Sequence, residues 1–484
     1  MHAALRQAVA IAVACAGLAA CTVGPDFHAP ASTSSATYVA GAAPATITAA
    51  GATQRFAAAA DIRADWWALF QAPRLDALLR AALAASPTLA EARARLVAAQ
   101  ETREAAESAA LWPSATLRAG IERQRIDPAA LGFPQAPNPG PFTLYDIGVG
   151  VGYTFDVFGG TRRAIEGLGA DVDYARYELE AAQRTLAANI VTAALHEASL
   201  VAQLAALARI ADAQRATFAI AQKRFDLGAI AEVDLASQGV LVAETDARRP
   251  PLEAELARTA HRLAVYAGRE PSQAADPPFT LEEFRLPPDI PLVLPSTLAA
   301  RRPDIRAAAA LLHRASADVG VATAALYPQF SFSGNASSTR NSLADIANGI
   351  NIWSIGLSLA QPLLRGPELS ARKRAAIATY DATRAAYRES VLHGLQEVAD
   401  AIRALEADAR AQDARAAAAA AAERAWSITR QRYDLGGVSE LALLDAERTR
   451  LEATLSERDA AAARFADTAA LVNALGGGYW EAAP

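Results

Sequence analysis

Lysine, methionine and cysteine are scarce in this 484-residue sequence, which has two Lys (Lys223 and Lys373), one Met (Met1) and two Cys (Cys15 and Cys21). Positive charge is therefore carried almost entirely by Arg, and acids and bases are interspersed to give a formal net charge of −6. This mixture provides no basic surface for a phosphate backbone, so we exclude nucleic acid as a partner.

Histidine is also sparse, and no histidine has a second ligand at the spacing of a metal site. The sequence lacks a nucleophile elbow and a phosphate-binding loop. We therefore expect no enzymatic activity, no metal and no noncovalent cofactor. His2 is expected to be removed with an export signal, and the other histidines are expected on helix surfaces or in the core; they are His28, His196, His261, His313 and His393.

Residues 1–20 have the organisation of an export signal, with Arg6 before an apolar run, Ala8–Leu18, that is too short to span a bilayer. The string "LAAC" that ends at Cys21 is typical of a bacterial lipoprotein signal, although an alanine-rich chain can also produce it by chance. We expect Cys21 to carry a covalent lipid, and Thr22 after it, rather than Asp, favours the outer membrane. Removal of the signal leaves one thiol, so packing without disulfides must stabilise the exported chain.

Two very long segments are expected to be helical. Ala170–Leu227 contains neither Gly nor Pro, and Glu368–Leu435 contains only Gly394. At about 1.5 Å per residue these helices reach roughly 87 and 100 Å, far beyond an ordinary globular helix. The second segment also has the spacing of a coiled-coil seam, formed by Val391, Leu395, Val398, Ile402 and Leu405.

The two halves of the chain repeat each other. "RFDLGAIAEV" begins at Arg224 and "RYDLGGVSEL" at Arg432, while "AALWPSATL" at Ala109 matches "AALYPQFSF" at Ala324. A duplicated unit of this kind predicts two similar halves. The expected organisation is a signal peptide (1–20), a lipidated N-terminal segment (21–75), a first repeat (76–270), a proline-rich connector (271–295) and a second repeat (296–480). "RRPP" at Arg248–Pro251 is expected to kink the return helix of the first repeat.

Each repeat contains two candidate strands with a period of two. In Leu144–Val157 every odd position is apolar, and Ser114–Ile126, Gln329–Ala336 and Trp353–Leu359 alternate similarly. A half-buried soluble sheet has the same pattern. The export signal, the aromatic strand ends and the strand lengths favour the wall of a membrane barrel.

Four strands per chain cannot close a barrel, because an open edge in lipid leaves backbone groups without hydrogen bonds. Several copies must therefore share one barrel. Two copies would supply about eight strands and three about twelve, and only the larger number leaves room for a channel.

Five segments carry a family resemblance: "CTVGPDFHAP" at Cys21, "DWWALFQAPRLDALLRAAL" at Asp65, "LPSTLAARRPDIRAA" at Leu294, "YDLGG" at Tyr433 and "ALGGGYW" at Ala474. Together they resemble the NodT-type outer-membrane efflux lipoproteins of the TolC-like outer-membrane factor family. The resemblance covers essentially all of residues 21–480.

The resemblance implies a mainly α fold with a membrane β-barrel portion, in which a homotrimer forms a twelve-stranded barrel and a long periplasmic helical tunnel. It also implies the exit duct of a tripartite pump in the outer membrane. The partners would be a periplasmic adaptor, an inner-membrane transporter of the resistance-nodulation-division type and outer-membrane lipid, and the cargo would be small molecules such as drugs. The competing interpretation is a soluble periplasmic coiled-coil adaptor or a structural lipoprotein.

The repeated turns are expected at the ends of the long helices away from the membrane, where Gly228 and Gly436 can adopt the left-handed conformation that ends a helix. In relatives such tips contact the adaptor. We therefore predict adaptor contacts at Leu227, Gly228, Ala229, Leu435, Gly436 and Gly437, although helix capping alone also explains the glycines.

A gate is expected just after the second turn. Leu441 and Asp445 are four residues apart and share a helix face. In similar proteins this segment narrows the closed tunnel, and three Asp445 carboxylates near the axis would attract cations. A solvated acid beside a core leucine is the alternative. The counterparts in the first half, Val233 and Ser237, lack the acid.

Overall fold

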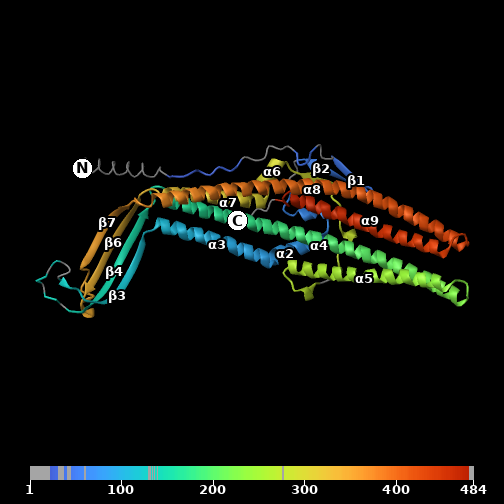
Figure 1. Ribbon diagram of the computed structural model, residues 1–484, viewed down its shortest axis with the longest axis horizontal. Helices are drawn as coiled ribbons and strands as arrows, with labels where there is room; N and C mark the ends of the chain where they lie inside the picture. Colours follow the sequence, from blue (N-terminus) through green and yellow to red (C-terminus); the bar gives the residue numbers. More distant parts are fainter. Residues whose placement is uncertain are drawn as a thin grey trace. The chain divides into compact units, whose positions relative to one another are not determined.

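The computed structural model describes residues 22–30, 37–40, 45–58, 62–128, 132, 134–135, 137–138, 140–274 and 277–478 (Figure 1). The chain contains two compact units. The strand unit comprises residues 1–30, 95–175 and 308–387, and the helical unit comprises residues 31–94, 176–307 and 388–484. Cys21, the expected lipidation residue, lies outside the described residues.

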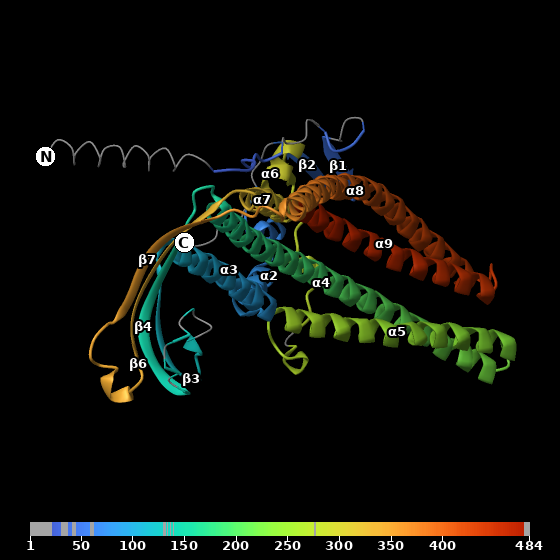
Figure 2. The same cartoon turned by 60° about the vertical axis from the view of Figure 1, so that its left-hand side comes forward.

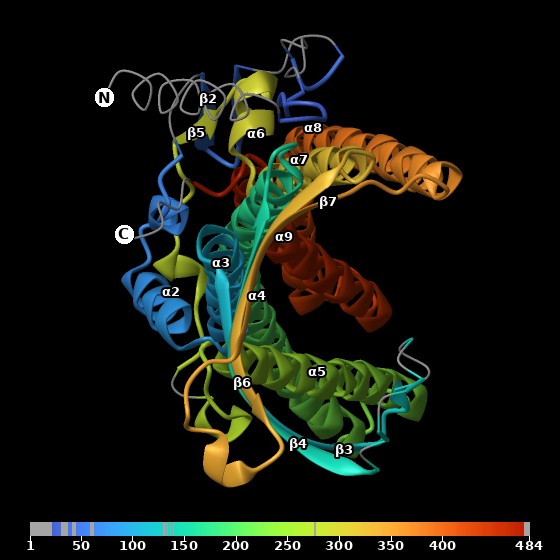
Figure 3. The same cartoon turned by 90° about the vertical axis from the view of Figure 1, so that its left-hand side faces the viewer.

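The strand unit contains the four strands that the alternating pattern predicts. β3 (Ser114–Gln124), β4 (Phe142–Phe155), β6 (Gln329–Arg340) and β7 (Ile352–Ala360) form one antiparallel sheet in the order β3-β4-β6-β7. The sheet curves strongly (Figures 2 and 3). The prediction of a mainly helical fold with a four-stranded sheet is confirmed.

One face of this sheet is apolar and uncovered. The register places Leu117 beside Val149, and Val149 beside Ala336, so the apolar positions of neighbouring strands share a face. On the edge strands Leu117 is 70% exposed and Ile355 is 71% exposed. A soluble sheet would bury such a face, so the exposed apolar band favours contact with lipid over the half-buried alternative.

Four helices dominate the helical unit. α4 (Gly160–Asp226) leads into α5 (Glu232–Tyr266), and α8 (Gly366–Asp434) leads into α9 (Glu440–Ala474), so the unit contains two long helical hairpins (Figure 1). α4 and α8 have 67 and 69 residues, about 100 Å each at 1.5 Å per residue. Their first turns lie in the strand unit.

The core of the helical unit lies where α4, α8 and α9 pack with the shorter elements η1 (Trp66–Phe70), α2 (Pro73–Ala85) and α6 (Pro295–Arg301). Of the predicted seam, Val398, Ile402 and Leu405 are fully buried, whereas Val391 and Leu395 are only partly buried. The remaining helices, α3 (Pro87–Leu111) and α7 (Pro303–Ala324), lead into the first strand of each repeat.

A second sheet was not predicted. β1 (Thr46–Ala49) pairs with β2 (Ala52–Ala58), and β2 pairs in parallel with β5 (Asp289–Leu292), which lies in the proline-rich connector. Two short 3-10 helices, η3 (Pro271–Gln273) and η4 (Leu281–Glu283), precede β5. Another 3-10 helix, η5 (Leu343–Asp345), follows β6. Strands this short have too few residues to establish a period, and β5 acquires its partner only by long-range contact.

The two prolines that were expected to kink the return helix lie in α5. Pro250 and Pro251 lie inside one continuous helix from Glu232 to Tyr266. Proline lacks a backbone N–H, so the carbonyl groups of Asp246 and Ala247 lose their usual helical partners without ending the helix.

Two buried arginines hold the helical unit together. Arg302 donates to the backbone carbonyl oxygens of Ala474 (2.9 Å) and Gly394 (3.5 Å), and to the carboxylates of Asp304 (2.6 Å) and Glu397 (2.7 Å). These contacts connect the start of α7 with α8 and the end of α9. The motif "RRPDI" therefore has a structural role.

Arg464 stabilises the small sheet formed by β1, β2 and β5 in a similar way. Its fully buried guanidinium donates to the backbone carbonyl oxygens of Ala49 (2.8 Å) and Ala52 (3.0 Å) and to the side-chain oxygens of Gln54 (2.9 Å) and Gln412 (3.2 Å). This network fastens the β1–β2 turn onto α8 and α9.

Candidate functional site

The two repeated turns have the same backbone geometry. In the first, the N–H groups of Gly228 and Ala229 donate to the carbonyl oxygens of Phe225 (2.8 Å) and Arg224 (2.8 Å). This pair of bonds is a Schellman motif, and the φ of 68° at Gly228 is the left-handed conformation that the motif requires.

In the second turn, Gly436 and Gly437 donate to Tyr433 (2.9 Å) and Arg432 (2.7 Å), and Gly436 has a φ of 72°. The next helix begins with Ser439, whose hydroxyl oxygen accepts from the Ala442 N–H at 3.3 Å. The sequence motif therefore encodes a helix stop followed closely by a helix start.

The residues predicted to contact an adaptor project from the helical hairpins. Leu227 is 84% exposed and Leu435 is 87% exposed. A Cβ atom added at Gly228 or Gly436 would meet no other described atom within 4 Å. Ala229 and Gly437 are exposed as well. Each turn thus presents a small glycine surface with one projecting leucine, which is a shape that another helical hairpin can approach closely.

Polar side chains connect the first turn to the second. The Arg224 guanidinium donates to the Tyr433 hydroxyl and lies 5.5 Å from the centre of its ring. The Tyr433 hydroxyl in turn lies 3.5 Å from one Glu440 oxygen, and buried Gln238 donates to the other at 3.0 Å. Burial raises the pKa of the Tyr433 hydroxyl, and the charge of Glu440 adds to this effect. This network, which we call the turn network, joins both helical hairpins of one chain.

The predicted gate residues lie near the start of α9, where Leu441 directly follows Glu440 of the turn network. Leu441 is 70% exposed although it is apolar. Asp445 is exposed and accepts a 2.7 Å salt bridge from Arg448 on the same helix. In the first hairpin Val233 is also exposed, and Ser237 donates to its backbone carbonyl oxygen at 2.8 Å. The second hairpin therefore carries a charged pair where the first has a hydroxyl group.

Sequence reasoning missed the turn network and Arg448. One signal was available: "RFDLG" and "RYDLG" differ only at the aromatic residue, so Tyr433 has a hydroxyl group where Phe225 has none. Arg448 lies within "ELALLDAER" three residues after Asp445, at a spacing that brings side chains together on a helix.

A pair of acids lies between α8 and α9 in the body of the helical unit. The carboxyl group of Asp467 on α9 is hydrogen-bonded to that of Asp408 on α8. Burial, together with the neighbouring Asp408, raises the pKa of Asp467 to about 6. One carboxyl group of the pair therefore holds a proton at mildly acidic pH.

The segment that follows the expected lipidation residue is tightly held within the strand unit. Buried Arg163 donates to the carboxylates of Asp26 (2.6 Å) and Glu166 (2.7 Å). Glu166 also lies 2.8 Å from His313, on which Phe27 stacks with ring centres 4.3 Å apart. The motif "PDF" near the N-terminus thus docks into a specific polar and aromatic site.

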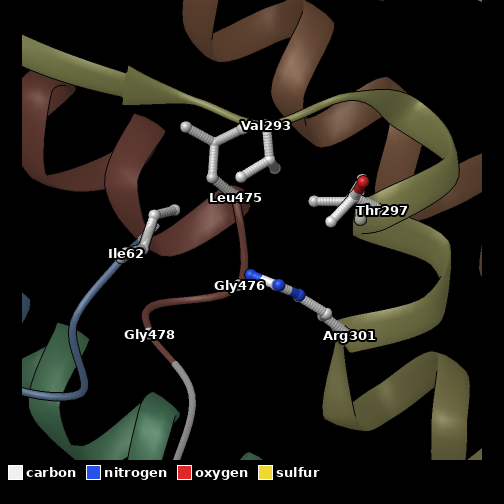
Figure 4. Close-up of a pocket in the computed structure, with 8 residues that line it drawn as sticks. Ile62, Val293, Thr297, Arg301, Leu475, Gly476 and Gly478 are labelled. Carbon is white, nitrogen blue, oxygen red and sulfur yellow. The ribbon is translucent and has the colours of Figure 1, made fainter. Parts of the chain in front are cut away.

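The glycine-rich motif near the C-terminus has a packing role. A Cβ atom at Gly478 would lie 1.9 Å from the Arg63 carbonyl oxygen, and one at Gly477 would lie 2.9 Å from the Arg184 side chain. Beside this segment is a cavity of about 20 Å³, with room for about one water molecule. Figure 4 shows its lining, which consists of Ile62, Val293, Thr297, Leu298, Arg301, Leu475, Gly476 and Gly478.

Metal binding has no evident site in the described part of the chain, where no group of three or more His, Cys, Asp or Glu side chains is arranged to hold an ion.

Comparison with known proteins gives a consistent result. The profile of a family described as outer membrane efflux protein matches residues 78–269 and 294–477. The pyoverdine export outer membrane protein OpmQ of Pseudomonas aeruginosa is 29% identical over 426 residues, 87% of this chain and 88% of that protein. Nodulation protein T of Rhizobium leguminosarum bv. trifolii is 26% identical over 425 residues, 86% of this chain and 88% of that protein. The structure of the outer-membrane channel OprN superimposes with a TM-score of 0.84 at 29% identity, covering 95% of this chain and 99% of that one.

Proposed function

This chain belongs to the outer membrane efflux protein family, and on that premise we propose that three copies form the exit duct of a tripartite efflux pump. The single observation that carries the proposal is the incomplete four-stranded sheet. Its apolar face is exposed, and each of its edge strands, β3 and β7, pairs with only one other strand in the described chain. A sheet of this kind is complete in lipid only when further copies close it into a barrel. Three copies give about twelve strands, which leave room for a channel, whereas the eight strands of two copies fill their interior with side chains.

The long helices then form the periplasmic part of the duct. We propose that they surround a tunnel continuous with the barrel, as expected for a channel of the outer membrane. The helices α4 and α8 are each about 100 Å long at 1.5 Å per residue, a length suited to crossing much of a periplasm. Cys21, with its expected lipid, would add an anchor in the same membrane.

Its partners would be a periplasmic adaptor and an inner-membrane transporter of the resistance-nodulation-division type. The proposed adaptor contact is the pair of turns, with Leu227, Gly228 and Ala229 in one and Leu435, Gly436 and Gly437 in the other. Their glycine surfaces and exposed leucines support this assignment, because close backbone approach and an apolar anchor are what a docking hairpin needs.

The proposed gate is formed by Leu441 and Asp445. Around a three-fold axis Leu441 would exclude water, and the charged pair of Asp445 and Arg448 would control which ions pass. Arg448 reduces the negative charge that three aspartates alone would produce. In this proposal the turn network stabilises the closed state of the duct, because it holds the second hairpin against the first.

The cargo is proposed to be small molecules. OpmQ, by its name, exports pyoverdine, and TtgC of Pseudomonas putida is named as part of a toluene efflux pump, so relatives of this chain serve different compounds. A duct that accepts whatever the transporter delivers is consistent with this range.

Carbonate extraction of membranes that contain a Cys21→Ala variant tests the proposal. A protein held by its barrel stays in the pellet without its lipid, whereas a soluble lipoprotein or adaptor is released. Size measurement of the solubilised protein should then give three copies, and a monomer in detergent and in nanodiscs would overturn the assignment as a shared barrel.

A further inference from the structure

The helical unit contains an open groove of about 820 Å³ to which the proposed function assigns no role. Its walls come from α2, from the C-terminal part of α5 and from the proline-rich connector, and Glu197 of α4 also lines it (Figures 1 and 2). Every lining residue belongs to the helical unit of one chain. Small-molecule sites usually have a volume of about 300 to 1,000 Å³, so this groove is large enough for a drug-sized ligand.

Most of the groove lining is aliphatic. Alanine and leucine side chains predominate on both helical walls, and they include Ala77, Leu78 and Ala81 of α2 and Leu256, Ala257 and Ala260 of α5. Such walls suit an apolar ligand, because removal of apolar surface from water is favourable. They do not distinguish one apolar molecule from another, so any selectivity of the groove depends on its polar groups.

Glu197 is the buried charged residue of this lining, with an exposure of only 4%. Its Oε2 atom accepts a hydrogen bond from the backbone N–H of Phe279 at 3.0 Å, whereas its Oε1 atom has no donor among the described residues. Burial raises the pKa of the Glu197 carboxyl group, and the Phe279 N–H and the charge of Arg74 act in the opposite direction. A buried acid with a free acceptor that lines a groove is a candidate ligand-binding group.

The other charged residues of the lining are already compensated. Arg74 donates to both carboxylate oxygens of Glu283, at 3.0 and 3.1 Å. Glu253 is exposed and accepts a 2.6 Å hydrogen bond from Arg249. Arg269 is exposed, so water screens its charge. The groove therefore retains one uncompensated buried charge, and that charge is negative.

The repeat in the sequence shows that helix packing does not require an acid at this position. Counting back along α4 and α8 from the repeated turns, in which Arg224 corresponds to Arg432, aligns Glu197 with Leu405. Leu405 is fully buried in the core of the helical unit. A buried carboxylate is costlier than a buried leucine unless a positive charge or hydrogen-bond donors compensate it. The acid of the first repeat therefore indicates a binding role.

We propose that this groove binds an amphiphilic amine, whose protonated amino group donates to Glu197 while its apolar body lies against α2 and α5. An ammonium group supplies both the positive charge and the donors that the free Oε1 atom lacks. An anionic amphiphile is repelled by the same carboxylate, and a neutral one leaves the charge uncompensated. Because one chain supplies every wall, the site does not depend on the number of copies in the proposed duct. A neighbouring subunit that fills the groove is the alternative occupant.

Binding of dansylcadaverine to the full-length protein in nanodiscs tests the site. This probe joins a protonated amino group to an apolar fluorescent ring system, so its emission rises when it enters the groove. Glu197→Gln retains an acceptor for the Phe279 N–H but removes the charge, and it should weaken binding about 10- to 100-fold. Glu253→Gln changes an exposed acid of the same groove and should bind like the wild type. Equal affinity of the wild type and Glu197→Gln would overturn the proposal.

An uncharged analogue, N-pentyl dansylamide, separates charge recognition from apolar partition. It should bind the wild type and Glu197→Gln with the same low affinity. Ala81→Phe leaves Glu197 intact and fills part of the groove from an exposed position, so it should weaken binding of both probes. Unchanged binding to this variant, or a wild-type protein that binds neither probe because a neighbouring subunit fills the groove, would contradict the proposal. A monomeric protein that binds the amine through Glu197 would uphold the site and count against the proposed duct.

Discussion

Arg224, in the last turn of α4, donates a hydrogen bond to the hydroxyl group of Tyr433, in the last turn of α8. The two residues are at nearly equivalent positions of the repeat, yet the contact is possible only because the second half has Tyr where the first has Phe225. The duplication therefore produced two similar helical hairpins, and the Tyr433 hydroxyl group forms one of the polar contacts between them. Glu440 and Gln238 extend this contact into α9 and α5.

Removing that hydroxyl group tests whether the turn network keeps the duct closed. Tyr433→Phe retains the ring but loses its bonds to Arg224 and Glu440, at a cost of about 1 kcal/mol per hydrogen bond. We expect a higher single-channel conductance in planar bilayers with an unchanged trimer. Tyr387→Phe, a partly buried tyrosine elsewhere on α8, is the control and should conduct like the wild type. Equal conductance of all three proteins would contradict a closing role for the turn network.

The acid pair between α8 and α9 predicts a pH dependence of stability. The pKa of Asp467 is raised to about 6 by burial and by Asp408, so its protonated form is favoured in the folded protein. Its contribution to stability is therefore fully present below the unfolded pKa near 4 and is lost as the pH rises through about 6. Asp467→Asn should raise the thermal unfolding midpoint at pH 7.5 and change it little at pH 4.5.

The expected gain at neutral pH is about 1 to 2 kcal/mol after allowance for solvent screening of a half-buried group. Unfolding scans of the detergent-solubilised protein at several pH values measure it. Asp400→Asn, a substitution of an exposed acid on α8, should reproduce the wild-type profile. An Asp467→Asn protein with the wild-type profile would show that the pair does not hold an extra proton.

Arg302 predicts a large loss of stability on truncation. Arg302→Ala removes four hydrogen-bonded contacts and leaves Asp304 without its closest buried partner, for which a cost of about 3 to 5 kcal/mol is typical. We expect little folded protein in the membrane. Combining Arg302→Met with Asp304→Asn removes both charges while keeping most of the volume, so it should recover part of the yield. Normal yield of Arg302→Ala would contradict the role assigned to this buried arginine.

Lipidation and assembly are expected to be separable. Cys21→Ser should abolish acylation, detected as loss of palmitate labelling, while the trimer still forms because the strands rather than the lipid close the barrel. Size measurement in detergent provides the readout. A purely monomeric Cys21→Ser protein would show that the anchor is needed for assembly.

The parts of the fold that follow a local period could be predicted from the sequence. Strand alternation identified β3, β4, β6 and β7, and the absence of Gly and Pro identified α4 and α8, to within a few residues at most ends. The repeated glycine turns were equally clear because left-handed residues end helices. These features depend on residues that are close in sequence.

The features that the sequence did not reveal depend on distant residues. β5 pairs with β2 across more than two hundred positions, and Arg302 and Arg464 acquire their roles only from carbonyl groups brought near them by folding. Pro250 and Pro251 are accommodated within the long helix α5, and the kink expected at them stays a prediction. At the proposed gate, Arg448 lies three residues after Asp445, a spacing that permits an ion pair on a helix. Whether the pair forms depends on the side-chain rotamers, which the spacing alone does not determine.

Single-channel recording of the purified trimer tests the central claim, that this chain is a duct closed near the turns of its second helical hairpin. Leu441→Ala combined with Asp445→Ala should raise conductance and reduce cation selectivity, because an apolar ring and a negatively charged ring are both removed. Arg448→Ala should shift selectivity the other way, towards cations, and Ser237→Ala in the first hairpin should change neither property. If the double variant conducts like the wild type at every salt concentration, the constriction lies elsewhere and this account of the gate is wrong.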